Sequence, residues 1–203
     1  MRTPKIEALH RLIDWLNNRP ENKQLIKLGI DSSAISSNSW LSGFIEADGN
    51  FYSGINLNSK NIVNSVKCYM RISQRKYYHI TIQNNNYTNS YLPIMEEIKK
   101  FLSVSQLIVI NRNRNNFIEL GYEIRTVKKK SCDILIDYLT KYPLFSSKHL
   151  DYLNWLNIIE VQKESKNKTK TIEYSNFILK LKKNMNTSRT IFNWKHLDNF
   201  YVK

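Results

Sequence analysis

The sequence predicts an α+β fold whose elements follow one another as αββαββα, with a further helix after them and an antiparallel sheet. Two observations support this order. Apolar residues recur with the period of a helix in some segments and with the period of a strand in the segments between them. Turn-forming polar residues separate these segments. Because no part of the order is repeated in tandem, we expect the chain to hold one copy of the unit.

The first predicted element is a helix within a leader, residues 1–37. Ile6 to Leu16 carries apolar residues at helical spacing, and Arg19-Pro20 ends the pattern because proline cannot continue a helix. A polar linker rich in serine follows. We therefore predict a helical leader joined by a linker to a domain at 38–163, with a basic helix and tail at 164–203.

The next predicted element is a short helix that passes directly into a strand. Asn38 and Ser39 are good N-cap residues, and an apolar stripe begins at Leu41. Gly49 supplies the stop. Beyond it, Phe51 to Leu57 alternates apolar with polar or small side chains, as a half-buried strand does.

The remaining elements follow from the same two periods. Cys68, Met70 and Ile72 share one face of a second strand. The polar stretch at Gln83–Asn86 is predicted to be a loop, and an asparagine-rich turn joins the last two strands. The other segments are a second strand at Val66 to Ser73, a helix at Leu92 to Leu102, strands at Leu107 to Arg112 and Phe117 to Arg125, and helices at Cys132 to Leu139 and Leu150 to Ile159.

Composition favours a nucleic-acid partner. The 203 residues suffice for a substantial core, and 41% hydrophobic residues indicate a globular protein. The net charge of +14 comes from 31 Lys and Arg against 17 Asp and Glu, spread along the chain. A polyanionic partner explains such an excess. We expect no membrane association, because no segment has the length of a transmembrane helix.

The two cysteines, Cys68 and Cys132, are too few for a disulfide framework or a zinc site, and we expect both in the core. Glu7 and Asp14 break the acid-poor pattern of an import peptide, so the protein is expected to act where it is made. The four histidines have no paired ligand spacing, and we assign none of them to catalysis.

Small residues mark one face of the short helix. Gly43 and Ala47 lie four residues apart, so a second helix could approach unusually closely there. Asp48 follows in the last turn, where the helix dipole opposes a carboxylate. A bound divalent cation would offset that cost. Taken alone, the same residues also fit a packing helix whose aspartate caps a turn.

The string from Leu41 to Gly49, LSGFIEADG, resembles the signature of the LAGLIDADG homing endonucleases and intron maturases. The resemblance continues in Tyr69–Gln74, Asn115–Leu120, Tyr142–Lys148 and Phe192–Trp194, and so covers most of the chain. It implies an αββαββα unit whose sheet cradles nucleic acid. The opening Arg2–Ile6 resembles the segment that closes the first half of a two-motif member, which makes the chain similar to a C-terminal half.

The resemblance also assigns roles to individual residues. Asp48 would bind Mg²⁺ at the scissile phosphate, with the backbone carbonyl of Ala47 as a second ligand. Lys148 takes the position of the active-site lysine, and Gln74 the position that orders solvent. The small face at Gly43 and Ala47 would be the interface with a second signature helix.

Arginines on the predicted strands are the candidates for contacts to nucleic acid. Strands can lie in a major groove, and alternation places Arg71 and Arg75 in one row with Ser73. The full set of predicted contacts is Arg71, Arg75, Arg112, Arg114, Arg125 and, within a basic run that suits the phosphate backbone, Lys128.

A single signature leaves the activity open. Cutting both strands requires two metal-binding acids, so the chain must pair, either as a homodimer or with a separate first half. The leading interpretation is a Mg²⁺-dependent, site-specific DNA endonuclease. The alternative is an RNA-binding protein without cleavage, acting as a group I intron maturase or with the proteins of a mitochondrial ribosome or other ribonucleoprotein. Richness in Asn, Lys, Ile and Tyr is typical of A+T-rich coding and, with the resemblance, indicates a fungal mitochondrial gene and a matrix location.

Overall fold

The computed structural model describes residues 1–20, 24–78, 89–115, 117–165 and 170–198. A four-stranded antiparallel sheet forms its centre, in the order β1-β2-β4-β3. The strands are β1 (Gly49–Leu57), β2 (Val63–Arg75), β3 (Ile108–Arg114) and β4 (Phe117–Arg125). The helices are α1 (Ile6–Asn17), α2 (Trp40–Asp48), α3 (Leu92–Phe101), α4 (Lys129–Lys141), α5 (Lys148–Glu164) and α6 (Ile172–Lys183).

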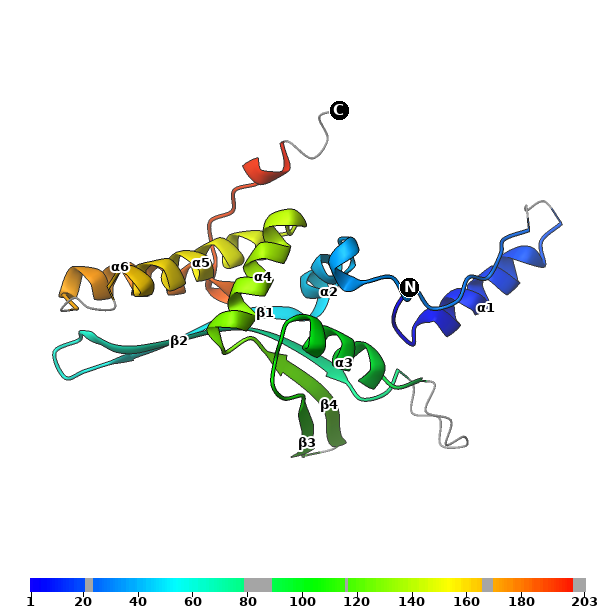
Figure 1. Cartoon of the computed structure of the whole chain (residues 1–203), viewed down its shortest axis with the longest axis horizontal. Helices are drawn as coiled ribbons and strands as arrows, with labels where there is room; N and C mark the ends of the chain where they lie inside the picture. The colour runs from blue at the N-terminus through cyan, green and yellow to red at the C-terminus, as the bar shows by residue number, and fades with distance from the viewer. Residues whose placement is uncertain (21–23, 79–88, 116, 166–169, 199–203) are drawn as a thin grey trace.

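The predicted element order is confirmed. The structure has αββαββα from α2 to α4, followed by α5 and α6, and α1 lies in the leader (Figure 1). The predicted loop at Gln83–Asn86 lies outside the described residues. No helix within the described part of the chain is both long enough and apolar enough to cross a bilayer.

The core lies between one face of the sheet and the helices. Phe51 of β1 is fully buried and contacts Trp155 of α5, with the ring centroids 5.4 Å apart. Alternation along β2 places Met70 and Ile72 on the same buried face. The prediction that both cysteines lie in the core is correct for Cys132, whereas Cys68 is only half-buried. Burial raises the pKa of both thiols, that of Cys68 to about 11.

Tyr138 of α4 fixes the beginning of α2. Its hydroxyl accepts hydrogen bonds from the backbone N–H groups of Leu41 and Ser42, at 3.1 and 3.3 Å, and donates to the carbonyl of Asn38 at 2.8 Å. The side chain of Asn38 accepts from the N–H of Trp40. Ser39, the N-cap residue, makes no side-chain cap, so a distant helix supplies most of the capping that we expected from local sequence.

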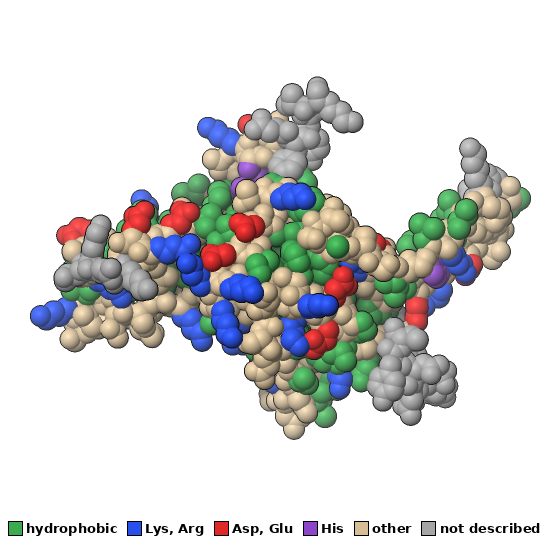
Figure 2. Space-filling model, in the orientation of Figure 1, with side chains coloured by type: hydrophobic (Ala, Val, Ile, Leu, Met, Phe, Trp, Pro, Cys, Tyr) green, Lys and Arg blue, Asp and Glu red, His purple; other side chains and the backbone are tan. Residues whose placement is uncertain are grey.

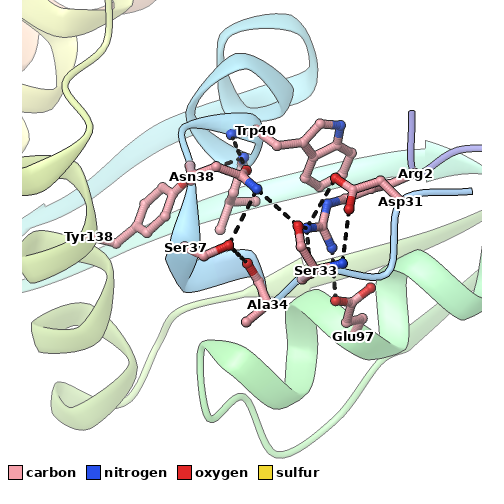
Figure 3. Close-up of polar contacts among 10 residues, drawn as sticks. Arg2, Asp31, Ser33, Ala34, Ser37, Asn38, Trp40, Glu97 and Tyr138 are labelled. Atoms are coloured by element: carbon pink, nitrogen blue, oxygen red, sulfur yellow. Dashed lines mark hydrogen bonds and ion pairs between the residues drawn. The ribbon is translucent and has the colours of Figure 1, made fainter.

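The leader is fixed to the domain through Arg2, which is almost fully buried (Figure 3). Its guanidinium forms ion pairs with Asp31 and Glu97 at 3.4 and 3.1 Å, and donates to Ser33. It also lies 5.6 Å from the ring centroid of Trp40, at the start of α2. One side chain therefore joins the leader, α3 and α2.

The rest of the leader extends away from the sheet (Figure 1). Residues 24–30 run back along α1, where Asn17 bonds the backbone of Leu25 and Lys27 pairs with Asp14. The apolar residues of α1 are unevenly covered: Ile13 is buried, whereas Leu12 and Trp15 are each about half accessible, and hydrophobic side chains are visible on part of this arm in Figure 2. The helix is therefore confirmed, and part of its apolar surface is exposed in the single chain.

Candidate functional site

The end of α2 brings together two of the predicted catalytic residues. Asp48 is the last residue of the helix and is half-buried. The side-chain amide of Gln74, on β2, donates a hydrogen bond of 2.5 Å to Asp48 Oδ2. Because β1 starts immediately after Asp48 and pairs Asn50 with Arg71, Asp48 lies two residues from the strand position that faces the predicted arginine row.

Gly49 ends α2 as expected, and the structure shows why glycine is needed there. Its backbone is extended, with φ −81° and ψ 153°, and not left-handed as a glycine stop usually is. A Cβ at this position would lie 2.7 Å from the carbonyl oxygen and 2.7 Å from Cγ2 of Ile45. Only glycine allows β1 to leave so close to the last turn of the helix.

Lys148, the first residue of α5, caps the same end of α2. Its ammonium donates to three backbone carbonyls, those of Ile45, Glu46 and Gly49, at 3.0, 2.7 and 2.7 Å. Burial lowers the pKa of Lys148, and the nearby carboxylates, Glu46 first, oppose that shift. A cation thus lies against the negative end of the helix dipole and beside Asp48, with its three N–H groups engaged.

Glu46 is a site residue to which the sequence analysis gave no role. Its carboxylate accepts from the backbone N–H of Phe145 at 2.5 Å, from the N–H of Ser146 at 2.9 Å, and from the Ser146 hydroxyl. Glu46 lies two positions before Asp48, with only Ala47 between them, so helical geometry directs the two acids to different sides. That spacing could have indicated that the signature's two acids have separate roles, one holding the 145–148 segment and one free for other chemistry.

Two histidines pack beside this segment. The rings of His149 and His196 are stacked, with centroids 4.2 Å apart, and His196 Nε2 donates to the carbonyl of Phe145 at 2.9 Å. Burial lowers the pKa of His149, and the proximity of His196 lowers it further. These contacts hold the C-terminal tail against α5.

The small-residue face of α2 is open to solvent in the single chain. Gly43 and Ala47 are both exposed, and no atom lies within 4 Å of the place where a Cβ on Gly43 would be. A shallow hollow of about 340 Å³ includes both residues and Asp48, and is bordered by Met1, Thr3, Lys5, Trp40, Phe44 and Tyr91. The helix surface predicted to meet a second helix is therefore accessible.

The predicted arginines of the sheet share one face, opposite the helices. The strand register sets Arg71 of β2 against Arg125 of β4, and Arg75 lies on the same side of β2. Arg112 and Arg114 on β3 oppose Glu119 and Phe117 of β4 and follow the same alternation. Lys128 lies outside the strands, as the exposed N-cap residue of α4. Figure 2 shows Lys and Arg side chains spread over the visible face of the molecule.

The donor atoms at the end of α2 suit a hard divalent cation. Mg²⁺ prefers carboxylate and carbonyl oxygens and keeps several waters, so one carboxylate and one carbonyl per chain are compatible with it. The carbonyl of Ala47 lies in the last turn, where helix carbonyls lack an intrahelical partner. The described residues contain no group of three or more His, Cys, Asp or Glu side chains that could hold a metal. A site here would need further oxygens from nucleic acid or a second chain.

Comparison with known proteins identifies the signature. A profile described as LAGLIDADG endonuclease matches residues 41–159, more than half of the chain, from the start of α2 into α5. The chain belongs to this family. The family assignment and the fold that the sequence resemblance implied are thereby confirmed.

Named relatives agree with this assignment. The chain is similar to the intron-encoded DNA endonuclease aI3 of Saccharomyces cerevisiae, with 32% identity over all of the chain and 53% of that protein. It is also similar to probable intron-encoded endonuclease 4 of Neurospora crassa, with 28% identity over 74% of the chain and 23% of that protein. The LAGLIDADG chain therefore spans about half or less of the length of these relatives.

Solved structures share the fold at lower sequence identity. The LAGLIDADG homing endonuclease I-LtrWI, bound to target DNA, superposes with a TM-score of 0.57 and 21% identity, over 87% of this chain and 53% of that one. The homing endonuclease I-TnaI gives a TM-score of 0.52 and 22% identity, over 78% of this chain and 90% of that one.

Proposed function

We propose that this LAGLIDADG chain is one half of a Mg²⁺-dependent DNA endonuclease that pairs through α2, either with a second copy or with a separate first half. The observation that carries this proposal is the position of Asp48. Its carboxylate lies at the end of α2, whose small-residue face, Gly43 and Ala47, is exposed. Pairing along that face would bring a second acid alongside the first.

The proposed division of labour follows from the contacts at the end of α2. Asp48 and the carbonyl of Ala47 would hold Mg²⁺, which when bound would polarise a phosphodiester and activate water. Gln74, by donating to Asp48, fixes the orientation of the carboxylate. Two contacts hold the last turn of α2 in place. Lys148 of α5 donates to the backbone carbonyl of Glu46, and the Glu46 carboxylate accepts from the backbone N–H of Ser146, just before α5. Lys148 would place positive charge close to the phosphate.

DNA is the proposed partner because the face of the sheet opposite the helices carries the predicted arginines, and I-LtrWI and other neighbours of the same fold are described as bound to DNA. Arginine forks suit both guanine edges and phosphates. The domain division proposed is a leader at 1–37, the LAGLIDADG unit at 38–163, and a basic helix and tail at 164–203. The fungal, intron-encoded relatives support a mitochondrial gene.

One observation favours the second candidate, an RNA-binding protein without cleavage that acts in intron splicing or in a ribonucleoprotein. All three N–H groups of the Lys148 ammonium are engaged by backbone carbonyls, so the predicted active-site lysine acts as a helix cap in the single chain. Binding through the arginine face would need neither that lysine nor a metal.

The test uses the full chain and a pool of DNA duplexes with a randomised segment. Bound duplexes are selected in chelator, Mg²⁺ is added, and the ends are sequenced. We expect cleavage by wild type, loss of cleavage with retained binding for Asp48→Asn, and unchanged cleavage for Asp137→Asn, which alters an exposed acid of α4. Full cleavage by Asp48→Asn would contradict the assignment. No cleavage by wild type, with preferred binding to structured RNA, would support the second candidate.

A further inference from the structure

Two glutamates lie among the arginines of the sheet. Glu119 and Glu123 are four residues apart on β4, so alternation places both on the face opposite the helices. The strand also carries Arg125, one of the predicted nucleic-acid contacts, whereas no role was predicted for the two acids. Their contacts have the same form, because each carboxylate forms ion pairs with two arginines.

Glu123 is the centre of the first cluster. Its carboxylate accepts hydrogen bonds from Arg125 Nε at 2.6 Å and from the hydroxyl of Ser73 at 2.8 Å, and a terminal nitrogen of Arg125 lies at 2.5 Å in the same ion pair. Arg71 lies 3.9 Å away on the neighbouring strand. The side chain of Glu123 is only 2% exposed, whereas those of Arg71 and Arg125 are 40% and 32% exposed. The acid is thus buried beneath guanidinium groups that reach solvent.

Glu119 is the centre of the second cluster, nearer the β3–β4 end of the sheet. It pairs with Arg112 at 3.6 Å and with Arg114 at 3.1 Å, where Arg114 Nε also donates a hydrogen bond. Both arginines come from β3, and about half of each guanidinium side chain is exposed. Four of the predicted nucleic-acid contacts are therefore held by just two carboxylates.

Aromatic stacking orients the first cluster further. The guanidinium of Arg125 lies 5.4 Å from the ring centroid of Tyr69, and Tyr69 stacks on Tyr52 of β1 at 4.7 Å. The row Tyr52, Tyr69, Arg125 thus crosses three adjacent strands. A guanidinium fixed by a carboxylate and by a ring loses little side-chain entropy when it binds.

Each cluster retains a net positive charge and unused donors. A guanidinium has five N–H groups, and a carboxylate can accept only some of those offered by two arginines. The remaining donors of the exposed guanidiniums can reach a base edge in a groove. A free arginine would instead turn readily toward any phosphate, which adds affinity without sequence information.

We propose that Glu119 and Glu123 are specificity-determining positioning residues, each holding two arginines in the geometry that reads base edges. The proposal rests on the proposed function, because it requires a duplex lying against this face. Removing either carboxylate makes the net charge of the chain more positive by one unit and frees two arginines to contact phosphates. Binding to random sequence then strengthens and becomes more salt-dependent, while discrimination falls by on the order of 10-fold for each reading arginine released.

The test compares Glu119→Gln and Glu123→Gln with wild type in the full chain. The matched control is Glu96→Gln, which removes an exposed acid of α3 that pairs with Lys99 and so makes the same change in net charge away from the sheet. Affinities for a duplex selected by wild type and for a random-sequence duplex are measured between about 50 and 200 mM salt.

We expect both sheet variants to lower the ratio of the two affinities and to steepen the salt dependence for random duplex, and the control to leave the ratio unchanged. The side chain of Glu119 is one-third exposed, so Glu119→Gln should still fold. This variant therefore tests the proposal if the buried Glu123→Gln fails to fold. Folded variants that select the same sequence as strongly as wild type overturn the role of the glutamates and leave the proposed function intact. A wild-type chain that binds no duplex overturns both.

Discussion

The exposed face of α2 makes a strong prediction for Gly43→Leu. No atom lies within 4 Å of a Cβ at this position, so the isolated chain has room for the larger side chain. Replacing an exposed mid-helix glycine with a good helix former stabilises a helix by about 1 kcal/mol. We therefore expect the free energy of unfolding of the single chain to stay the same or rise by up to about 1 kcal/mol.

The same substitution should prevent pairing. Small residues at Gly43 and Ala47 allow close approach, whereas ordinary side chains hold helix axes about 8–10 Å apart. Overpacking a tight contact typically costs about 1–3 kcal/mol, which weakens association by about 5- to 150-fold. Cleavage of both strands requires Asp48 and a second acid from the paired helix, so its rate would fall as association weakens.

The assay combines urea denaturation of the chain with sedimentation in the presence of a selected duplex. Gly49→Ala is the contrasting variant, because its Cβ would lie 2.7 Å from the carbonyl oxygen of Ile45 and should destabilise the chain itself. A Gly43→Leu chain that is destabilised would show that this face is occupied within the chain. A variant that is stable, still pairs and still cleaves would refute the interface.

Three further predictions concern the groups that hold the site. Lys148→Met removes three hydrogen bonds at the end of α2 and should lower the free energy of unfolding by about 1–3 kcal/mol in urea titrations, whereas the exposed Lys141→Met should not. Arg2→Ala should cost about 2 kcal/mol and speed proteolysis of the leader, since Asp31 and Glu97 lose their shared partner; unchanged proteolysis would contradict the anchoring role. The lowered pKa of His149 means that the unfolded chain takes up a proton more readily, so stability should fall as the pH drops below the ordinary value of 6.5. Thermal unfolding at about pH 7.5 and about pH 5.5 checks this, and His149→Gln should flatten the difference.

The elements were predictable because their signals are local. Helical and alternating periods located α2 and β1, and the string from Leu41 to Gly49 identified the family before any geometry was available. The presence of α1 also followed from its pattern. Its exposure did not, because periodicity reports which face is apolar and not what covers it.

The contacts that build the site were less predictable, since they join residues far apart in the sequence. Tyr138 caps a helix that begins about a hundred residues earlier, and Glu46 holds a segment at a similar separation. Gly49 was expected to end α2 and does so, but only the structure shows that the close approach of its backbone to Ile45 requires the lack of a side chain. Alternation on β4 could have placed Glu119 and Glu123 among the arginines. Only the structure gives their bonds.

The most direct test of the proposed site is to measure metal binding at the end of α2 by a method that does not depend on cleavage. Mn²⁺ uptake is measured by electron paramagnetic resonance for the protein–duplex complex, with the duplex alone as background. We expect protein-dependent uptake that Asp48→Asn abolishes and Asp137→Asn preserves. Equal uptake by the wild-type and Asp48→Asn complexes would contradict the assignment of the metal to Asp48.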